Sequence, residues 1–445
     1  MIFIGDLVHC PSLGKLEILR DHVLVPGNDI SRIPKGTFLL PTFCDLHLHA
    51  PQFLYQGTGL HLPLMQWLNE YAFKAEERID NDPDLAQRVY SRLARRLVER
   101  GTGAVLLFGT IKETTNLILA QCMIDAGIRA FVGKLSMDRS SRPTYVEASA
   151  EISLAAAASF ADRCASLENM VDSHAGLAKP VLTPRFVPTC SDELLTGLGR
   201  LSAERGLLVQ SHMAESLDQV EWVKSERGMD DIEVFDRSNL LTPRTIQAHC
   251  TFLTPSSLCK VAERGSAIAH CPLSNAYFSA EPFRLREALD NGVKVGLGTD
   301  VAGGYDIDIM GSMRQAVAVS RMREGARLVH KVAPDAIQES KPLSVDWKEA
   351  LYLATTGGAR TLGLGEESGT FAVGAAFDAQ CINLMNETTC QGTGPLDFLD
   401  REHEGMGNWE LSDELIEKWW CLGDFRNRVS MWVQGKKVPR TRCDP

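Results

Sequence analysis

Two histidines separated by one residue, His47 and His49, constrain the fold of this chain more than any other feature. They close an apolar stretch, residues 38–46, that has the character of a buried strand. Alternate side chains of a strand share a face, so the two imidazoles point the same way, about 7 Å apart, and suit one metal ion. A pair of packed core histidines is the alternative. Three further apolar segments end in metal-ligand chemistry, at His212, His249 and Asp300.

Strands that each deliver such a residue at the C-terminal end are typical of the mouth of a (β/α)₈ barrel. Strand-like and helix-like patterns alternate from about residue 40 to about residue 360. After the first strand, seven more are predicted: 105–108, 129–135, 180–186, 207–212, 245–249, 266–271 and 293–300. Helical spacing falls between them, at 85–100, 114–126, 192–205, 217–227, 283–291 and 308–324. An open doubly wound sheet is the alternative, but it would not bring His47 and Asp300 together.

The two ends of the chain differ from the middle. Residues 1–37 and 366–445 contain short β-like segments with turn residues, and neither end is long enough to bury a core alone. The sequence therefore predicts an α/β protein with two parts. Residues 38–365 form the TIM-like barrel, and residues 1–37 plus 366–445 form one small β-sandwich domain. Residues 63–73 are expected to be a helical excursion, either a packing helix or a wall of the pocket.

Composition narrows the class of partner and the compartment. A net charge of -11 and a pI of about 5.5 argue against a nucleic-acid or anionic-membrane surface as partner. The 12 cysteines include no CxxC pair, and several lie in apolar strand patterns, which suggests a reducing compartment. Residues 1–6 lack both the basic segment and the long apolar core of a secretory signal. A cytoplasmic protein with a small uncharged substrate is the expectation.

Taken together and in barrel order, these motifs resemble the amidohydrolase superfamily, and four blocks resemble specifically its guanine deaminases. The blocks are HLHAPQ (47–52), TPRF (183–186), QSHMAE (210–215) and GTDVAGG (298–304). Each block alone is modestly specific, but the set spans nearly the whole chain. The resemblance implies hydrolysis of guanine to xanthine and ammonia, and a homodimer.

The expected metal site combines three nitrogen donors, His47, His49 and His212, with one oxygen donor, Asp300. This set suits Zn²⁺ with a position left for water, and by resemblance these residues are the metal ligands. His249 is assigned beside the water or the substrate, with direct ligation left open. The fourth predicted strand ends in Thr183-Pro-Arg-Phe186, without a bridging carboxylate or lysine. We therefore expect one Zn²⁺ per chain.

Catalytic and substrate-binding roles are assigned by the same resemblance. Asp300 accepts the proton of the attacking water, and Glu215 is placed to donate a proton to the ring nitrogen and later to the departing amine. Gln52 and Arg185 offer hydrogen bonds to the base, with Arg185 directed at the exocyclic oxygen, and Phe186 stacks on the ring. For Arg185, a surface ion pair is the alternative. His212, Glu215, His249 and Asp300 complete the expected substrate site.

Two rival functions stay open on the sequence alone. One is a related deaminase acting on another aminopurine, a pterin or a triazine, and the other is a scaffold that has lost catalysis. The intact ligand set and Glu215 oppose the scaffold. The zinc-deaminase signature with H-x-E and P-C-x-x-C is absent from the sequence. Thr42 stands where the superfamily usually has glycine, which leaves the number of strands in the small β-domain open.

Overall fold

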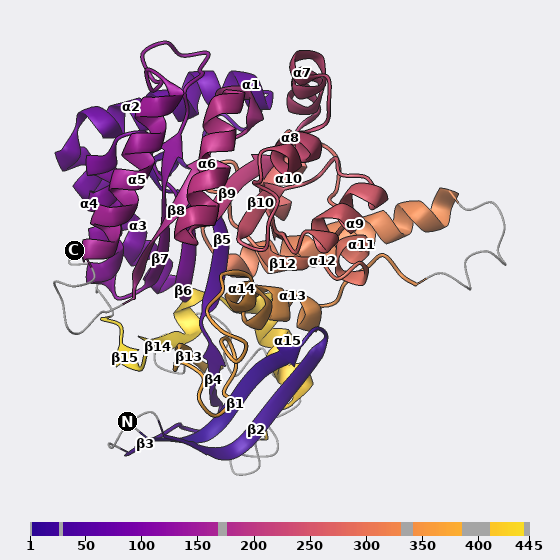
Figure 1. Cartoon of the computed structure of the whole chain (residues 1–445). Coiled ribbons are helices and arrows are strands. Elements are labelled where there is room, and N and C mark those ends of the chain that lie inside the picture. The colour runs from indigo at the N-terminus through magenta and orange to yellow at the C-terminus, as the bar shows by residue number, and fades with distance from the viewer. Residues whose placement is uncertain (1, 26–29, 168–175, 331–340, 385–409, 440–445) are drawn as a thin grey trace.

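A computed structural model describes residues 2–25, 30–167, 176–330, 341–384 and 410–439. Its centre is a sheet of eight parallel strands in sequential order, β5 to β12 (Figure 1). The predicted (β/α)₈ barrel is thereby confirmed. The strands are β5 (Phe43–His49), β6 (Thr102–Phe108), β7 (Arg129–Ser136), β8 (Ala178–Pro184), β9 (Leu208–Met213), β10 (Thr245–His249), β11 (Ala267–His270) and β12 (Lys294–Leu297).

Backbone hydrogen bonds close the barrel between its first and last strands. The Asp300 N–H donates to the His47 carbonyl at 2.8 Å, and the His49 N–H donates to the Val301 carbonyl at 3.0 Å. These bonds lie just past the end of β12, beside the two histidines. An open doubly wound sheet is therefore excluded, because its edge strands would not meet.

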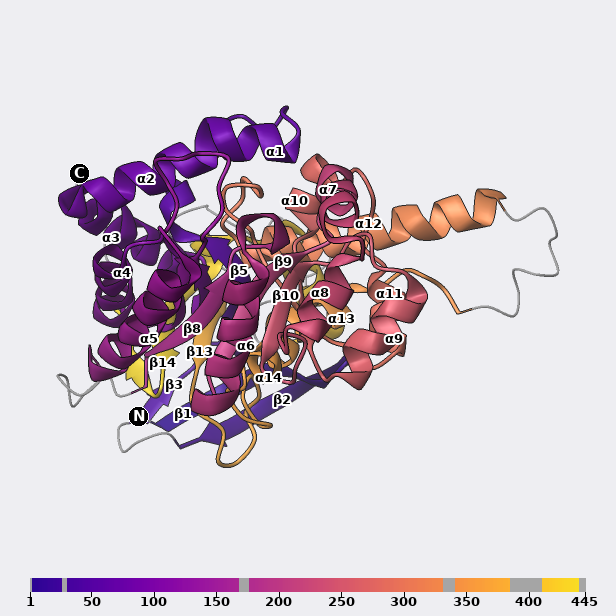
Figure 2. The same cartoon turned by 45° about the horizontal axis from the view of Figure 1, so that its top comes forward.

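Helices surround the barrel, and Figure 2 shows them packed around the strands. Local signals in the sequence account for where they begin and end. At α3, Asp82 accepts a hydrogen bond from the Leu85 N–H and Pro83 takes the first position. At α6, Ser191 caps the start, and Gly206 ends the helix in the left-handed conformation, φ 68°. The surrounding helices are α3 (Pro83–Glu99), α4 (Glu113–Ala126), α5 (Ala150–Leu167), α6 (Asp192–Arg205), α7 (Leu217–Arg227), α8 (Asp231–Arg237), α9 (Pro255–Glu263), α10 (Pro272–Phe278), α11 (Leu285–Asp290) and α12 (Ile309–His330).

A second sheet joins the two ends of the chain and lies below the barrel in Figure 1. Its strand order is β15-β14-β13-β4-β1-β2, with β3 paired to β1. The strands are β1 (Ile2–Ser12), β2 (Lys15–Leu24), β3 (Ile30–Arg32), β4 (Thr37–Pro41), β13 (Ala379–Asn383), β14 (Arg428–Val433) and β15 (Lys436–Lys437). We call it the terminal sheet. The prediction that the ends meet in one small β unit is confirmed.

Two details of that prediction need correction. The apolar stretch 38–46 is divided at Thr42 into β4, which pairs with β13, and β5, which starts the barrel. The boundary placed at residue 38 thus falls inside β4. The described strands form one sheet, where a sandwich was expected, because helices take the place of a second sheet. Residues of β1 and β4 share a core with α13 (Trp347–Ala354) and α15 (Asp413–Leu422).

Alternation along β1 supplies both faces of the terminal sheet. Val8 and Cys10 point into the core shared with the helices, whereas Phe3 and Leu7 point into a separate apolar cluster. In that cluster the Phe3 ring lies edge-on to Trp432, with centroids 5.0 Å apart. No helix in the described part of the chain is both long and apolar enough to cross a membrane.

Candidate active site at the barrel mouth

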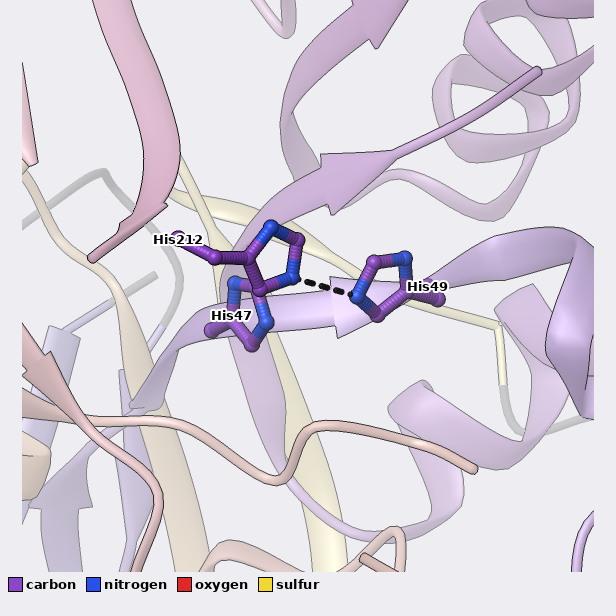
Figure 3. A group of neighbouring side chains, drawn as sticks. All are labelled: His47, His49 and His212. Carbon is purple, nitrogen blue, oxygen red and sulfur yellow. Dashed lines mark hydrogen bonds between the residues drawn. The ribbon is translucent and has the colours of Figure 1, made fainter. Parts of the chain in front are cut away.

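The four side chains predicted as metal ligands converge at the carboxyl ends of the barrel strands. Figure 3 shows three of them, His47, His49 and His212. His47 and His49 come from β5, His212 from β9, and Asp300 follows β12. The Nε2 atoms of His49 and His212 lie 3.0 Å apart. Asp300 Oδ1 lies 3.1 Å from His47 Nε2 and 3.5 Å from His49 Nε2. The structure therefore gathers the predicted set around one point, with every member buried.

The donor chemistry of this cluster fits a divalent metal ion. Burial, together with neighbouring positive groups, lowers the pKa of each of the three histidines well below its usual value, so the rings are neutral. Among the described residues, His47 Nε2 is buried without a hydrogen-bond partner. His212 Nδ1 donates to the Arg185 carbonyl at 2.6 Å, which leaves its Nε2 lone pair for the cluster. Three lone pairs and one carboxylate thus share a small volume.

Glu215 and His249 lie on one side of the cluster. Glu215 follows β9, and its Oε1 is 3.5 Å from His249 Nε2. His249 Nε2 is also 3.8 Å from Asp300 Oδ2, and His249 Nδ1 pairs with Asn275 Oδ1 at 2.9 Å. Burial and the charges of Asp300 and Asp218 raise the pKa of the Glu215 carboxyl well above its usual range. Glu215 is therefore suited to carry a proton near neutral pH.

A pocket opens onto this group of residues. Six residues predicted to touch substrate line it: Gln52, Arg185, Phe186, His212, Glu215 and Asp300. His249, also expected there, is fully buried at the edge of the cluster and is absent from the described lining. Apolar walls come from Leu64, Trp67, Leu68 and Phe278, and the rings of Trp67 and Phe278 lie 5.0 Å apart. The helical excursion, α1 (Leu64–Trp67) and η2 (Leu68–Ala72), is thus a pocket wall.

Comparison with known proteins assigns the family. The amidohydrolase family model matches residues 38–436. Guanine deaminase of Mus musculus is 35% identical over 98% of this chain and 96% of its own length, and that of Homo sapiens is 36% identical over the same shares. The chain belongs to the guanine deaminases of the amidohydrolase family. The crystal structure of a C. acetobutylicum guanine deaminase with bound guanine has 29% identity, covers 98% of this chain and 99% of its own, and has a TM-score of 0.84.

Two carboxylates of this guanine deaminase fold were missed by sequence reasoning. The first, Asp45, lies on β5 and accepts hydrogen bonds from the Thr299 hydroxyl at 2.5 Å, the Thr299 N–H at 3.0 Å and the His47 N–H at 3.2 Å. Burial raises its pKa to about 7. Asp45 thus ties the backbone next to Asp300 to the backbone of His47. Its position two residues before His47 was the available signal.

The second missed carboxylate is Glu76, on α2 (Phe73–Asn81). It is fully buried and pairs with Arg185, whose guanidinium was weighed as either a base contact or a surface ion-pair partner. Arg185 is only 2% exposed, so the surface alternative is wrong. The available signal was helical spacing, which places Glu76 on the same face as the apolar residues Phe73 and Ile79.

Proposed function

We propose that the protein hydrolyses guanine to xanthine and ammonia. The observation that carries the proposal is one pocket that joins two kinds of chemistry. One side offers the metal-type donors together with Glu215. The other side offers Gln52 and Arg185, which suit a flat base with a carbonyl group. The resemblance of the whole chain to guanine deaminases points to the same reaction.

The residues that would hold the metal are His47, His49, His212 and Asp300. We propose one Zn²⁺ per chain, since three neutral nitrogen donors and one carboxylate match its preferences. The end of β8 carries Thr183, Pro184 and Arg185, so it lacks the carboxylate or lysine that would bridge a second ion. A bound Zn²⁺ lowers the pKa of water enough to supply a nucleophile near neutral pH.

The protein's own groups then move the protons. Water oxygen adds to the ring carbon that carries the amino group, and Asp300 accepts the proton that the water releases. Glu215 donates a proton to the adjacent ring nitrogen, which becomes basic as the carbon turns tetrahedral. Glu215 then carries the proton held by Asp300 to the amino group, the carbon–nitrogen bond breaks and ammonia leaves. The hydroxyl on the same carbon gives its proton to Glu215 as its oxygen becomes the carbonyl oxygen of xanthine. His249, 3.5 Å from Glu215, is placed to orient that carboxyl.

The base is bound through hydrogen bonds to its edge and through aromatic and apolar contacts with its faces. Arg185 is a donor-only group, so it suits the exocyclic oxygen of guanine and disfavours an amino group at the same place. Gln52 contributes a further hydrogen bond, and Phe186 contributes an aromatic face. The apolar wall containing Trp67 covers the bound base and limits the access of bulk water to the pocket.

The decisive experiment measures ammonia release by the metal-loaded protein from guanine, adenine, cytosine and a pterin. Guanine should be the preferred substrate, with xanthine as the second product. Faster release from the pterin or from adenine would assign the protein to another deaminase of the family. Absence of turnover with all four, at full metal content, would favour the inactive scaffold.

We also propose that the protein is a cytoplasmic homodimer. The dimer rests on the family resemblance, and the compartment rests on the pattern of free cysteines. Sedimentation analysis of the purified protein should give twice the mass of one chain, and a monomer would contradict the dimer.

A further inference from the structure

One buried carboxylate stands behind the part of the pocket assigned to the base. Glu76 Oε2 lies 2.5 Å from Arg185 Nη1, and Glu76 Oε1 accepts a hydrogen bond from Gln52 Nε2 at 3.2 Å. Glu76 itself does not line the pocket, whereas Arg185 and Gln52 do. The two residues assigned to the base therefore share one support, which comes from α2 rather than from the barrel strands.

The same face of α2 stabilises the positive charge of Arg185. Phe73 precedes Glu76 by three residues, so both project from one side of α2. The Arg185 guanidinium carbon lies 4.9 Å from the centre of the Phe73 ring, a cation–π contact. A buried charge is strongly unfavourable unless it is paired. Glu76 and Phe73 thus allow Arg185 to stay charged while it is buried, and the ion pair has no net charge.

Glu76 also fixes which way the Gln52 amide points. A carboxylate only accepts hydrogen bonds, so Gln52 must turn its NH₂ group toward Glu76. The opposite end, Gln52 Oε1, accepts from the Ala302 N–H at 3.2 Å. With both ends engaged the amide cannot flip. One N–H and one carbonyl lone pair of Gln52 are left in a defined orientation at the pocket.

We propose that Glu76 is the specificity-determining positioning residue of this site. This role rests on the proposed function, and it gives Glu76 two effects. Glu76 holds Arg185 and Gln52 in the geometry that binds a 6-oxopurine, and it neutralises Arg185 so that the pocket favours an uncharged base over an anionic one. Xanthine loses a ring proton more readily than guanine, because its additional carbonyl stabilises the anion. Neutralising Arg185 therefore favours release of the product.

The other titratable groups that act on Arg185 are carboxyls and phenols. Arg185 is the one lysine or arginine among the described residues that line the pocket. Two carboxyls, Glu215 and Asp300, act electrostatically on it from the metal side. Burial raises the pKa of Tyr55 and Tyr145 well above the usual value, so both phenols are uncharged.

The main test is Glu76→Gln in the full-length, metal-loaded enzyme, with Glu77→Gln as matched control. Glu77 is the next residue on α2 and pairs with Arg142, away from the pocket. We expect Glu76→Gln to raise the KM for guanine about ten- to a hundredfold, in line with lost hydrogen bonds to charged groups. The kcat should stay within a fewfold, because Arg185 and Gln52 hold ground state and transition state alike. Glu77→Gln should change neither value.

Inhibition by xanthine separates positioning from a merely structural role. In Glu76→Gln, Arg185 has no carboxylate partner, so it should attract the xanthine anion. As the pH rises through the ionisation of xanthine, the ratio of the inhibition constant of xanthine to the KM for guanine should therefore fall. The Glu76→Asp variant keeps the charge with a shorter reach. In this variant, inhibition by xanthine should depend on pH as it does in the parent, while the KM for guanine stays partly raised.

Three results would overturn the inference. A folded, metal-loaded Glu76→Gln with the parent's KM and the parent's xanthine inhibition would show that Glu76 does not set the site. If Glu76→Gln fails to fold, an unchanged KM in the Glu76→Asp variant would contradict the positioning role just as directly. The third test needs only the parent enzyme. If the xanthine anion binds the parent more tightly than neutral xanthine does, the charge argument is wrong. A parent that releases no ammonia from guanine would instead refute the proposed function.

Discussion

The barrel mouth and the terminal sheet are equally buried, yet they are built from opposite kinds of side chain. At the mouth the buried atoms are imidazole nitrogens and carboxylate oxygens, and His47 Nε2 has no hydrogen-bond partner among the described residues. In the terminal sheet the buried cluster is apolar and aromatic, centred on Phe3 and Trp432. Polar groups held without partners oppose folding, whereas buried aromatic rings drive it.

The difference implies that activity and stability can be altered separately in this molecule. Substitutions at the mouth should remove activity while the chain stays folded. Substitutions in the terminal sheet should lower the free energy of unfolding while the folded enzyme keeps its kcat. Four variants test this separation, taken from the largest expected effect on activity to the smallest.

The largest effect is expected for His47→Ala. Loss of one of four metal ligands should empty the site, so kcat should fall by more than the roughly 10⁴-fold that bounds the loss of a general acid. Elemental analysis should show far less metal than in the parent. The metal-free variant should stay folded, because Nε2 of the removed ring has no hydrogen-bond partner in the described structure. His22→Ala, at an exposed site on β2, is the control, and full activity of His47→Ala would contradict the metal assignment.

Glu215→Gln should come next. The amide keeps the shape of the carboxyl but cannot shuttle a proton, so kcat should fall about 10²–10⁴-fold with the metal still bound. Glu221→Gln, exposed on α7, should leave kcat unchanged. If kcat of Glu215→Gln equals that of the parent, proton transfer belongs to another group.

Arg185→Leu should lower activity and stability together, because Arg185 is assigned to the base and also pairs with buried Glu76. The kcat/KM for guanine should fall by roughly two orders of magnitude through the lost charged hydrogen bond and misplacement of the base. The variant should also lose about 3–5 kcal/mol of stability, since Glu76 is left buried and unpaired. The double variant Arg185→Leu with Glu76→Gln should recover stability but not activity. Parent-like unfolding of the single variant would argue against a buried ion pair.

The smallest effect on activity is expected for Trp432→Ala in the terminal sheet. Removing this large ring should lower the free energy of unfolding by about 3–5 kcal/mol, measured by denaturant titration. Below its unfolding temperature the variant should keep the parent's kcat and metal content. Val23→Ala, at an exposed position on β2, is the control and should leave both the free energy of unfolding and kcat unchanged. A large drop in kcat of folded Trp432→Ala would show that the sheet acts on the mouth.

The barrel and the gathering of the predicted ligands followed from the sequence for a simple reason. Parallel strands of one barrel end at the same mouth, so a histidine or aspartate at each strand end is brought to one place regardless of its distance in the chain. This rule placed His212 and Asp300 beside His47 without any knowledge of contacts. Roles in catalysis are not fixed by this placement and stay predictions.

Features that depend on a partner distant in sequence were not predictable. Nothing in the apolar run 38–46 shows that β4 pairs with β13 near residue 380, so the run was taken as one strand. Glu76 lies within a charged stretch of helix, and its partner Arg185 is 109 residues away. A charged residue on a helix is most often solvated, so only the three-dimensional structure reveals a buried pair.

The bonds between Asp300 and His47 and between His49 and Val301 set an order of events during synthesis. A nascent chain that has emerged only as far as β11 already carries His47, His49 and His212, but the barrel is still open and the fourth ligand is missing. The strand that completes the wall is followed directly by Asp300, the last of the four proposed ligands. If these residues bind the metal as proposed, loading must wait for the last barrel strand, and a truncated chain ending before Asp300 has no complete site to load.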